Sequence, residues 1–153
     1  MDTEIQAYSG DFEDIMPLFL MSTGMDDVDG VRRLIKVEQA RGTHYFTAVQ
    51  AGRVVGMIGV YYDDNSAVDE LEPPQIIDVA VLPEYRKGGV ARQLMEHAVE
   101  QVRASGRNIV WLYTDGNSPA MLNFYTRLNF RLVSIVPDYF GQGTAKAIFR
   151  RDL

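Results

Sequence analysis

The alternation of hydrophobic and polar positions predicts a regular succession of strands and helices. Apolar residues spaced three or four apart indicate helices, whereas alternating patterns or short apolar runs between turn residues indicate strands. Helical spacing covers residues 11–24, 26–41, 89–105 and 118–128. Strand-like segments are 3–8, 44–50, 53–61, 75–81, 108–114, 130–136 and 145–151. The order β-α-α-β-β-β-α-β-α-β-β predicts a mixed-sheet α/β (α+β) fold in one domain, residues 1–153.

Two of these strands stand out because they are almost entirely apolar. Gln75–Val81 and Asn108–Thr114 carry few polar residues, which is expected of strands buried on both faces. The first follows an acidic loop, Asp63–Pro74. We therefore expect both strands at the centre of the sheet.

Composition narrows the class of protein. A chain of 153 residues with 46% apolar content supports a substantial core, and no apolar run reaches the roughly 18 residues of a membrane span. The acidic N-terminus does not resemble a signal peptide, so a cytoplasmic location is expected. The chain has no cysteine, which excludes disulfides and a cysteine nucleophile. Fifteen basic against twenty-one acidic residues give a net charge of −6, which argues against nucleic-acid binding.

Residues 77–98 contain the clearest chemical signal, a strand followed by a glycine loop and a helix. Unpaired N–H groups at a helix start attract anions, and Gly88-Gly89 lets the main chain approach a phosphate closely. A nucleoside-triphosphate P-loop is excluded, because Val90-Ala91 stands where lysine and a hydroxyl residue are required. Adjacent glycines also fail the GxGxxG spacing of dinucleotide-binding folds. No metal-binding motif occurs, so we expect no metal.

The loop instead matches the pattern R/Q-x-x-G-x-G/A as Arg86–Ala91, preceded by Val79–Tyr85. A second block comprises Ser118–Met121, Phe124-Tyr125 and Leu128–Phe130, with Asn129 where glycine is usual. Together the two blocks closely resemble the GNAT superfamily of N-acetyltransferases, over roughly residues 43–136.

The resemblance implies a fold and a cosubstrate. The fold is a mixed, mostly antiparallel central sheet of about seven strands, flanked by four helices, with a splayed strand pair at the cofactor site. The cosubstrate is acetyl-CoA, its pantetheine bonded by one strand and its diphosphate by the glycine loop. The implied cofactor-binding residues are Val79, Ala80, Val81, Arg86, Lys87, Gly88, Gly89, Val90, Ala91, Asn117 and Ser118.

The resemblance also implies catalytic roles. Tyr125 matches a tyrosine that acts as general acid toward the departing thiolate; the alternative is a core aromatic residue. Gln75 occupies a strand position where some members carry a glutamate base, so that role does not transfer. Asp78 and Glu72 are the nearest carboxylates and are alternative bases acting through water, while Asp78 could instead have a structural role.

The acceptor is left open between a small cationic amine and a peptide amine, with direct transfer in a ternary complex. Acidic residues within 22–30 and 63–72 would attract a cation if they line the acceptor site, but they could also form a solvated surface. The alternative function is a non-catalytic acyl-CoA-binding sensor or interaction module. Relatives are often dimers, so a homodimer is a further alternative.

Overall fold

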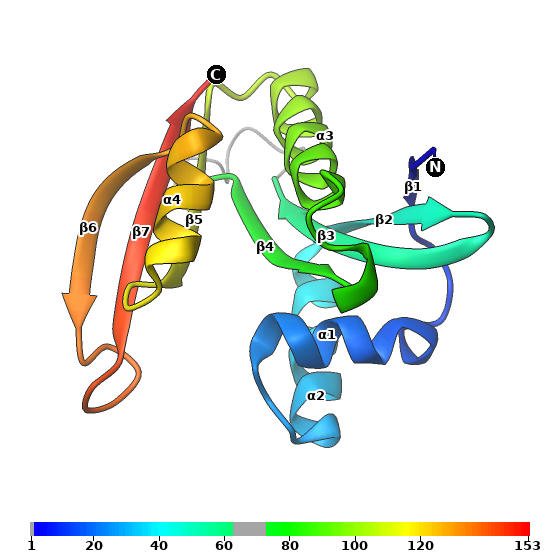
Figure 1. Cartoon of the computed structure of the whole chain (residues 1–153), viewed down its shortest axis with the longest axis horizontal. Coiled ribbons are helices and arrows are strands. Elements are labelled where there is room, and N and C mark those ends of the chain that lie inside the picture. Colours follow the sequence, from blue (N-terminus) through cyan, green and yellow to red (C-terminus); the bar gives the residue numbers. More distant parts are fainter. Residues whose placement is uncertain (1, 63–72) are drawn as a thin grey trace.

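The computed structural model describes residues 2–62 and 73–153, and Figure 1 shows their arrangement. The strands are β1 (Glu4–Ala7), β2 (His44–Gln50), β3 (Arg53–Tyr61), β4 (Gln75–Val81), β5 (Ile109–Asp115), β6 (Arg131–Pro137) and β7 (Ala145–Asp152). The helices are α1 (Met16–Thr23), α2 (Val28–Arg41), α3 (Val90–Ala104) and α4 (Pro119–Arg127), with 3₁₀ turns at Phe12–Ile15 and Pro83–Tyr85. The predicted element order is confirmed.

The strands form one sheet in the order β1-β2-β3-β4-β5-β7-β6. All neighbouring strands are antiparallel except β4 and β5, which are parallel. The sheet therefore consists of an N-terminal half, β1 to β4, and a C-terminal half, β5 to β7. The expected mixed, mostly antiparallel seven-stranded sheet with four helices is confirmed for the described residues.

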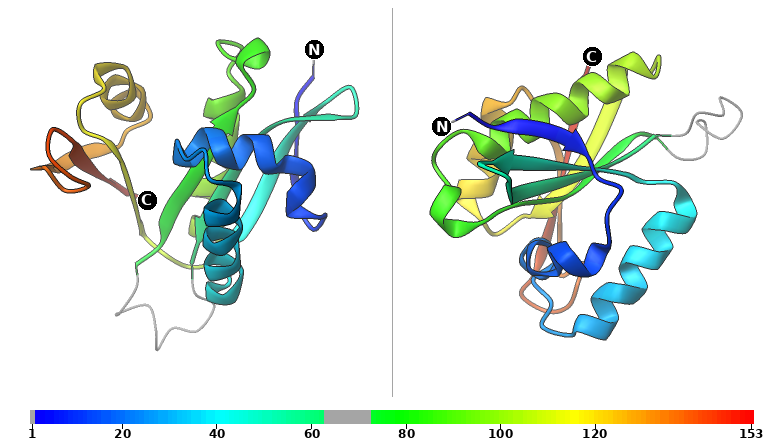
Figure 2. Two further views of the ribbon diagram at one scale, coloured as in Figure 1. Left: turned by 90° about the horizontal axis from the view of Figure 1, so that it is seen from below. Right: turned by 90° about the vertical axis from the view of Figure 1, so that its right-hand side faces the viewer.

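Helices cover both faces of the N-terminal half. The apolar stripe of α3, which includes Leu94 and Ala98, packs with Phe46 and Ile58 of the sheet in the larger core cluster. Helices α1 and α2 pack on the opposite face in a second cluster around Phe19. The view from the right-hand side in Figure 2 shows the sheet between α3 and these two helices. No described helix is both long and apolar enough to cross a membrane.

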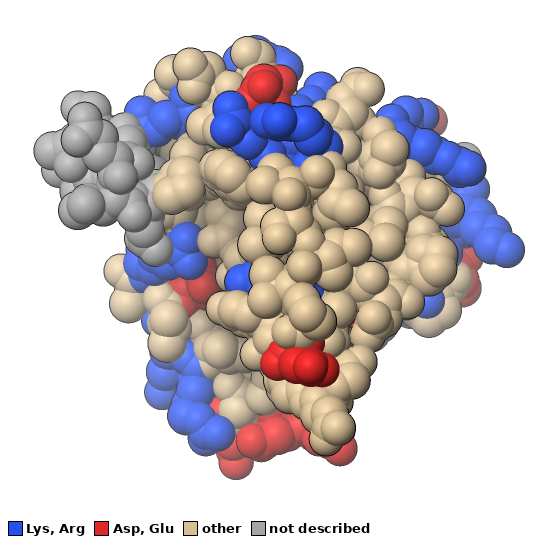
Figure 3. Space-filling view, turned by 90° about the vertical axis from the view of Figure 1, so that its left-hand side faces the viewer, with Lys and Arg blue, Asp and Glu red and all other residues tan. Residues whose placement is uncertain are grey.

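The C-terminal half is covered by α4 on one face and ends at an exposed edge. Tyr125 and Leu128 of α4 pack against Phe149 of β7. Leu132, Val133 and Ile135 of the edge strand β6 are exposed. Figure 3 shows that this side of the molecule is largely uncharged at its centre. The homodimer stays a prediction.

Turn and cap residues explain the element boundaries. Gly24 and Gly42 end α1 and α2 in the left-handed conformation that glycine adopts without a Cβ clash. The Asp11 carboxylate caps the first turn by accepting from the Glu13 N–H. That turn is 3₁₀, and the α-helix begins only at Met16. We attribute the late start to Pro17, which is favoured in a first helical turn and disfavoured further inside a helix.

The expectation that β4 and β5 are buried on both faces is wrong. In β4 only Ile76, Ala80 and Val81 are buried, and in β5 Tyr113 is 48% exposed. An apolar run indicates a central strand but not what covers each face. One face of each strand packs in the core, and the other borders a cleft.

The packing of α3 against the sheet can be tested at Leu94. Leu94 has 0% exposure, so we expect Leu94→Ala to lower the free energy of unfolding by about 2–5 kcal/mol, through lost burial and a residual cavity. Urea unfolding measures this change. Gln93→Ala, on the exposed side of the same helix, is the matched control and should stay within about 0.5 kcal/mol. Similar losses for the two variants would contradict the packing described.

Candidate active site

The site is created where the two halves of the sheet separate. Strands β4 and β5 pair only at Gln75 and Trp111, where the Trp111 N–H also donates to the Pro74 carbonyl (2.9 Å). Figure 1 shows the strands close together at this point and diverging downward. Beyond Gln75, the edge of β4 that faces β5 has no strand partner among the described residues. Its main-chain groups are therefore available to a ligand.

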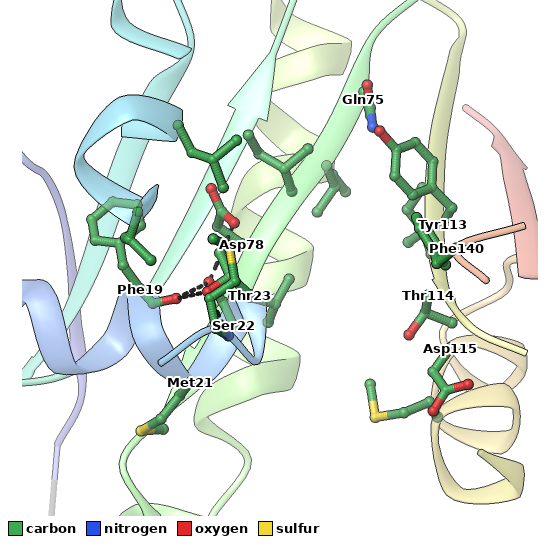
Figure 4. Close-up of a pocket in the computed structure, with 18 of the residues that line it drawn as sticks. Phe19, Met21, Ser22, Thr23, Gln75, Asp78, Tyr113, Thr114, Asp115 and Phe140 are labelled. Atoms are coloured by element: carbon green, nitrogen blue, oxygen red, sulfur yellow. Dashed lines mark hydrogen bonds between the residues drawn. The ribbon is translucent and has the colours of Figure 1, made fainter. Parts of the chain in front are cut away.

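A cleft of about 910 Å³ occupies the divergence. Its walls come from α1, α2, β4, β5, α4 and the connection between β6 and β7. Figure 4 shows Ser22 and Asp78 on one wall and Tyr113, Thr114 and Asp115 on the other. Within residues 2–62 and 73–153, no group of three or more side chains could hold a metal ion.

A β-bulge at Asp78 reshapes β4 beside the cleft. Met57 pairs with Ala80 and Gly59 with Ile77, so Asp78 and Val79 together stand opposite one residue of β3. Asp78 has φ +55°, a left-handed conformation that is uncommon for residues other than glycine but most accessible to asparagine and aspartate. Bulges bend a strand and redirect side chains. This bulge turns the β4 edge at Val79 and brings the Asp78 carboxylate to the cleft wall.

The glycine loop forms the entrance to α3. Gly89 has φ +83° and is the N-cap, and Lys87 is also left-handed. Gln93 is the first α3 residue whose N–H bonds back, to the Gly89 carbonyl, so the first-turn N–H groups have no intrahelical acceptor. A Cβ added at Gly89 would meet no described atom within 4 Å. The loop therefore presents open N–H groups at a positive helix end.

Arg86 is placed differently from the other loop residues. Its N–H donates to the Pro83 carbonyl (3.3 Å), and its side-chain Nε donates to the Val81 carbonyl (3.0 Å). Arg86 therefore ties the loop to the end of β4, and the open N–H groups begin at Lys87. Its contact with a cofactor stays a prediction.

A second groove, of about 420 Å³, lies between α3 and α4. It is lined by Arg92 of α3 and by Asn123, Phe124 and Arg127 of α4. The two guanidinium groups give it positive charge in a protein that carries a net charge of −6. Sequence reasoning did not predict this groove, because nothing in the sequence pairs the two helices.

Tyr125 lies at the boundary between the core and the cleft. It is 5% exposed, its ring packs against Phe124, Phe130 and Phe149, and it also lines the cleft. Burial raises its pKa to about 12. The hydroxyl is therefore protonated at neutral pH. Tyr125 is therefore both a core aromatic residue and part of the cleft wall.

Asp78 is held by two hydroxyl groups. The Ser22 hydroxyl of α1 donates to Oδ1 (3.2 Å), and the Tyr45 hydroxyl of β2 donates to Oδ2 (3.0 Å). Burial raises the pKa of Asp78, and the two hydrogen bonds oppose that rise. Burial and the neighbouring Asp78 charge likewise raise the pKa of Tyr45. The network joins α1 to the bulge and places a partly desolvated carboxylate on the cleft wall.

Glu38 and Gln75 lie in the same cleft, linked through Arg41. Arg41 lies 3.6 Å from a Glu38 carboxylate oxygen and donates to Gln75 Oε1 (3.2 Å). Gln75 Nε2 is buried and has no hydrogen-bond partner among the residues that the structure describes. Sequence reasoning missed Glu38. The available signal was a carboxylate within the apolar stripe of α2, seven residues after Val31.

The far end of the cleft is closed by the connection between β6 and β7. Phe140 and Thr144 from this connection line the cleft. The Asn117 side-chain amide donates to the Gly143 carbonyl (2.9 Å), and Ser118 caps α4 by accepting from the Met121 N–H (3.3 Å). These bonds explain the positions of Asn117 and Ser118. Their roles toward a cofactor stay predictions.

Of the two acidic regions expected near the acceptor, one does not line the described cleft and the other lies outside the described residues. The acids within residues 22–30 are absent from its lining, and Asp27 and Asp29 pair with Arg33 and Arg32. They form the solvated surface that was the alternative reading. Glu72 and the acids of 63–72 lie outside the described residues.

Comparison with known proteins places the fold in a family. The Acetyltransferase (GNAT) family matches residues 12–130. An N-alpha-acetyltransferase of Saccharolobus solfataricus is 24% identical over 88% of this chain and 92% of its own. The ribosomal-protein-bS18-alanine N-acetyltransferase of Escherichia coli K12 is 27% identical over 46% of this chain and 47% of its own. A Bacillus subtilis acetyltransferase solved with CoA has a TM-score of 0.81 at 18% identity, covering 99% of both chains.

The chain belongs to the GNAT acetyltransferase family. It is an N-acetyltransferase of the class that uses acetyl-CoA. The residues present fit that cosubstrate. The β4 edge is open beside the cleft, the α3 start offers free N–H groups to a diphosphate, and the groove beyond it is cationic.

Burial of Tyr125 has a consequence for stability at high pH. Its pKa is about 10 in the unfolded chain and about 12 in the folded protein, so the neutral hydroxyl favours the folded state. That contribution is complete below pH 10 and is lost as pH rises toward 12. Between pH 10 and 12, we expect wild type to lose stability relative to Tyr125→Phe by up to about 1.4 kcal/mol per pH unit. Urea unfolding from pH 8 to 11 measures the difference in unfolding free energy between the two proteins. A difference that does not change with pH would contradict the burial of Tyr125.

Proposed function

We propose that this protein transfers the acetyl group of acetyl-CoA directly to a primary amine while both substrates are bound. The observation that carries the proposal is the single cleft at the β4–β5 divergence. The cleft borders the open edge of β4, whose chain leads on to the helix start that suits a diphosphate, and its lining includes carboxylates that suit an amine. Tyr125 also lines this cleft. One cleft that holds both reactants supports direct transfer, and the absence of cysteine from the chain removes one route through a covalent acetyl-enzyme.

On the cofactor side, the main chain does most of the binding. Main-chain groups of Val79, Ala80 and Val81 on the open edge of β4 would bond the pantetheine amides, except the Val81 carbonyl, which accepts from Arg86 Nε (3.0 Å). The N–H groups from Lys87 to Ala91 would hold the diphosphate, with Arg86 fixing the loop. Asn117 and Ser118 would border the thioester end, where their elements meet the cleft.

Acetyl-CoA supplies an acetyl group on sulfur, and its transfer breaks the C–S bond as the amine nitrogen bonds the carbonyl carbon. Tyr125 would act as general acid and supply the proton that the departing sulfur takes up. Its pKa of about 12 keeps that proton available at neutral pH. A thiol has an ordinary pKa of about 8.5, and the same dry surroundings raise it. The difference in pKa between the thiol and Tyr125 is thereby reduced.

On the acceptor side, Asp78 is our candidate base. Its raised pKa makes it a better proton acceptor than an exposed carboxylate, and it lines the cleft. It would take the amine proton through a water molecule, because Ser22 and Tyr45 already bond both its oxygens. Glu72 stays an alternative prediction.

The test is thiol release from acetyl-CoA across a panel of amines, with wild type and Tyr125→Phe. We expect wild type to release thiol with at least one primary amine, and Tyr125→Phe to lower kcat by about 100-fold or more. Acetyl-CoA at 100 times its Kd should stabilise both proteins by about 2.7 kcal/mol, since the phenol is not needed for binding.

Tyr8→Phe is the matched control, because Tyr8 lies outside the described cleft lining and its hydroxyl donates to the Asp11 carbonyl (2.6 Å). It should leave kcat unchanged. Stabilisation by acetyl-CoA without any thiol release in the presence of the amines would support the non-catalytic acyl-CoA-binding sensor instead. An unchanged kcat in Tyr125→Phe would show that Tyr125 is not the general acid.

A further inference from the structure

One serine hydroxyl on the cleft wall has two acceptors and a single proton. Ser22 Oγ lies 3.1 Å from the carbonyl oxygen of Phe19, three residues earlier in α1, and 3.2 Å from Oδ1 of Asp78. Figure 4 shows Ser22 between these two groups. A serine hydroxyl carries one hydrogen and two lone pairs, so it donates to one of the two oxygens at a time. Oδ1 of an ionised Asp78 therefore shares its donor with the main chain.

The other oxygen of the same carboxylate has a donor of its own. The Tyr45 hydroxyl of β2 donates to Oδ2 (3.0 Å), and it has no second acceptor in the part of the chain that the structure describes. Tyr45 is 5% exposed, and its ring packs against Phe12 and Phe19. This packing keeps the hydroxyl on its one acceptor. Oδ2 is therefore bonded in both protonation states of Asp78, whereas the bonding of Oδ1 depends on the Ser22 hydrogen.

Protonation of Asp78 at Oδ1 gives every group in this network a partner. The new carboxyl O–H then donates to a lone pair of Ser22 Oγ, and the Ser22 hydrogen goes to the Phe19 carbonyl. Tyr45 continues to donate to Oδ2. Groups withdrawn from water favour such fully bonded arrangements. The network thus takes up a proton by the rotation of one hydroxyl hydrogen, without movement of a heavy atom.

The charges around Asp78 also bear on proton uptake. Burial raises its pKa, the hydrogen bonds from Tyr45 and Ser22 lower it, and the Glu38 carboxylate of α2 raises it again. Arg41, also of α2, lies 3.6 Å from Glu38 and offsets part of that charge. The titratable groups that line the cleft from β5 and α4 are Tyr113, Asp115 and Tyr125.

We propose that Ser22 is a positioning residue whose hydroxyl turns from Asp78 to the Phe19 carbonyl when Oδ1 takes up the acceptor's proton. This inference rests on the proposed acetyl transfer and specifies how its base receives a proton. Ser22 and Asp78 are half-buried and line the cleft, so the pair borders solvent. A water molecule would give a proton to Oδ1 and take one from the amine, so one N–H bond breaks and one O–H bond forms. The proton would leave to solvent after product release.

The experiment measures kcat against pH for Ser22→Ala and Tyr45→Phe, with an amine that the wild type acetylates. Turnover falls as pH drops below the pKa of the base. Tyr45 bonds a carboxylate more strongly than a neutral carboxyl group, so we expect its loss to move this acid limb up by about one pH unit. Ser22 serves both protonation states. We therefore expect its loss to lower kcat about 10-fold while moving the limb much less, and Ser22→Thr to restore the rate.

A ¹³C NMR titration of the Asp78 carboxyl group tests the network in the resting protein, without turnover. Asp78→Asn assigns the signal. We expect the pKa of Asp78 to rise in Tyr45→Phe and to change much less in Ser22→Ala. Ser105→Ala is the matched control, because Ser105 also donates to the carbonyl three residues earlier but lies at the end of α3, outside the described cleft lining. It should change neither kcat nor the titration.

Three results would overturn the role of Ser22. The first is a wild-type kcat in Ser22→Ala. The second is an equal rise in the pKa of Asp78 in Ser22→Ala and Tyr45→Phe, because a simple donor stabilises only the ionised carboxylate. The third is a loss of rate that Ser22→Thr does not restore. An absence of thiol release by the wild type with any amine would instead refute the proposed function, and the NMR titration would still test the network.

Discussion

The site depends on one constraint, the brief parallel contact between β4 and β5. The strands pair at Gln75 and Trp111 and then diverge, so the sheet is continuous at one end and open at the other. A fully paired parallel strand would use its main-chain groups in the ladder and leave none for a ligand. The bulge at Asp78 adds to the divergence by bending β4. The hydrophobic cores on either side hold the two halves of the sheet in place around the opening.

The same opening separates two electrostatic environments in an acidic protein. Toward α3 and α4, the helix start, Arg92 and Arg127 create positive potential suited to phosphates. Toward α2, Glu38 and Asp78 create negative potential suited to an amine. Phosphates would thereby be attracted to the groove between α3 and α4, and an amine to the cleft. Tyr125 lines the cleft, and its burial keeps the phenol neutral.

The cofactor half of this arrangement could be predicted from the sequence, whereas the acceptor half could not. Residues 86–91 are contiguous, and their glycines and helix start carry the signal locally. Glu38 comes from α2, whereas Gln75 and Asp78 come from β4, and only the fold brings these two elements together at the cleft. The left-handed conformation of Asp78 had no glycine to indicate it. The apolar runs correctly indicated central strands, but the divergence that exposes one face of each is a property of the whole sheet.

The central claim is that main-chain groups of β4 and the α3 start bind acetyl-CoA. An NMR titration of ¹⁵N-labelled protein with acetyl-CoA tests this claim most directly, because each backbone N–H reports separately. We expect the largest shifts at Val79–Val81 and Lys87–Ala91, with little change in β1, which lies far from the opening in the sheet order. Saturable binding that shifts neither segment would contradict the account.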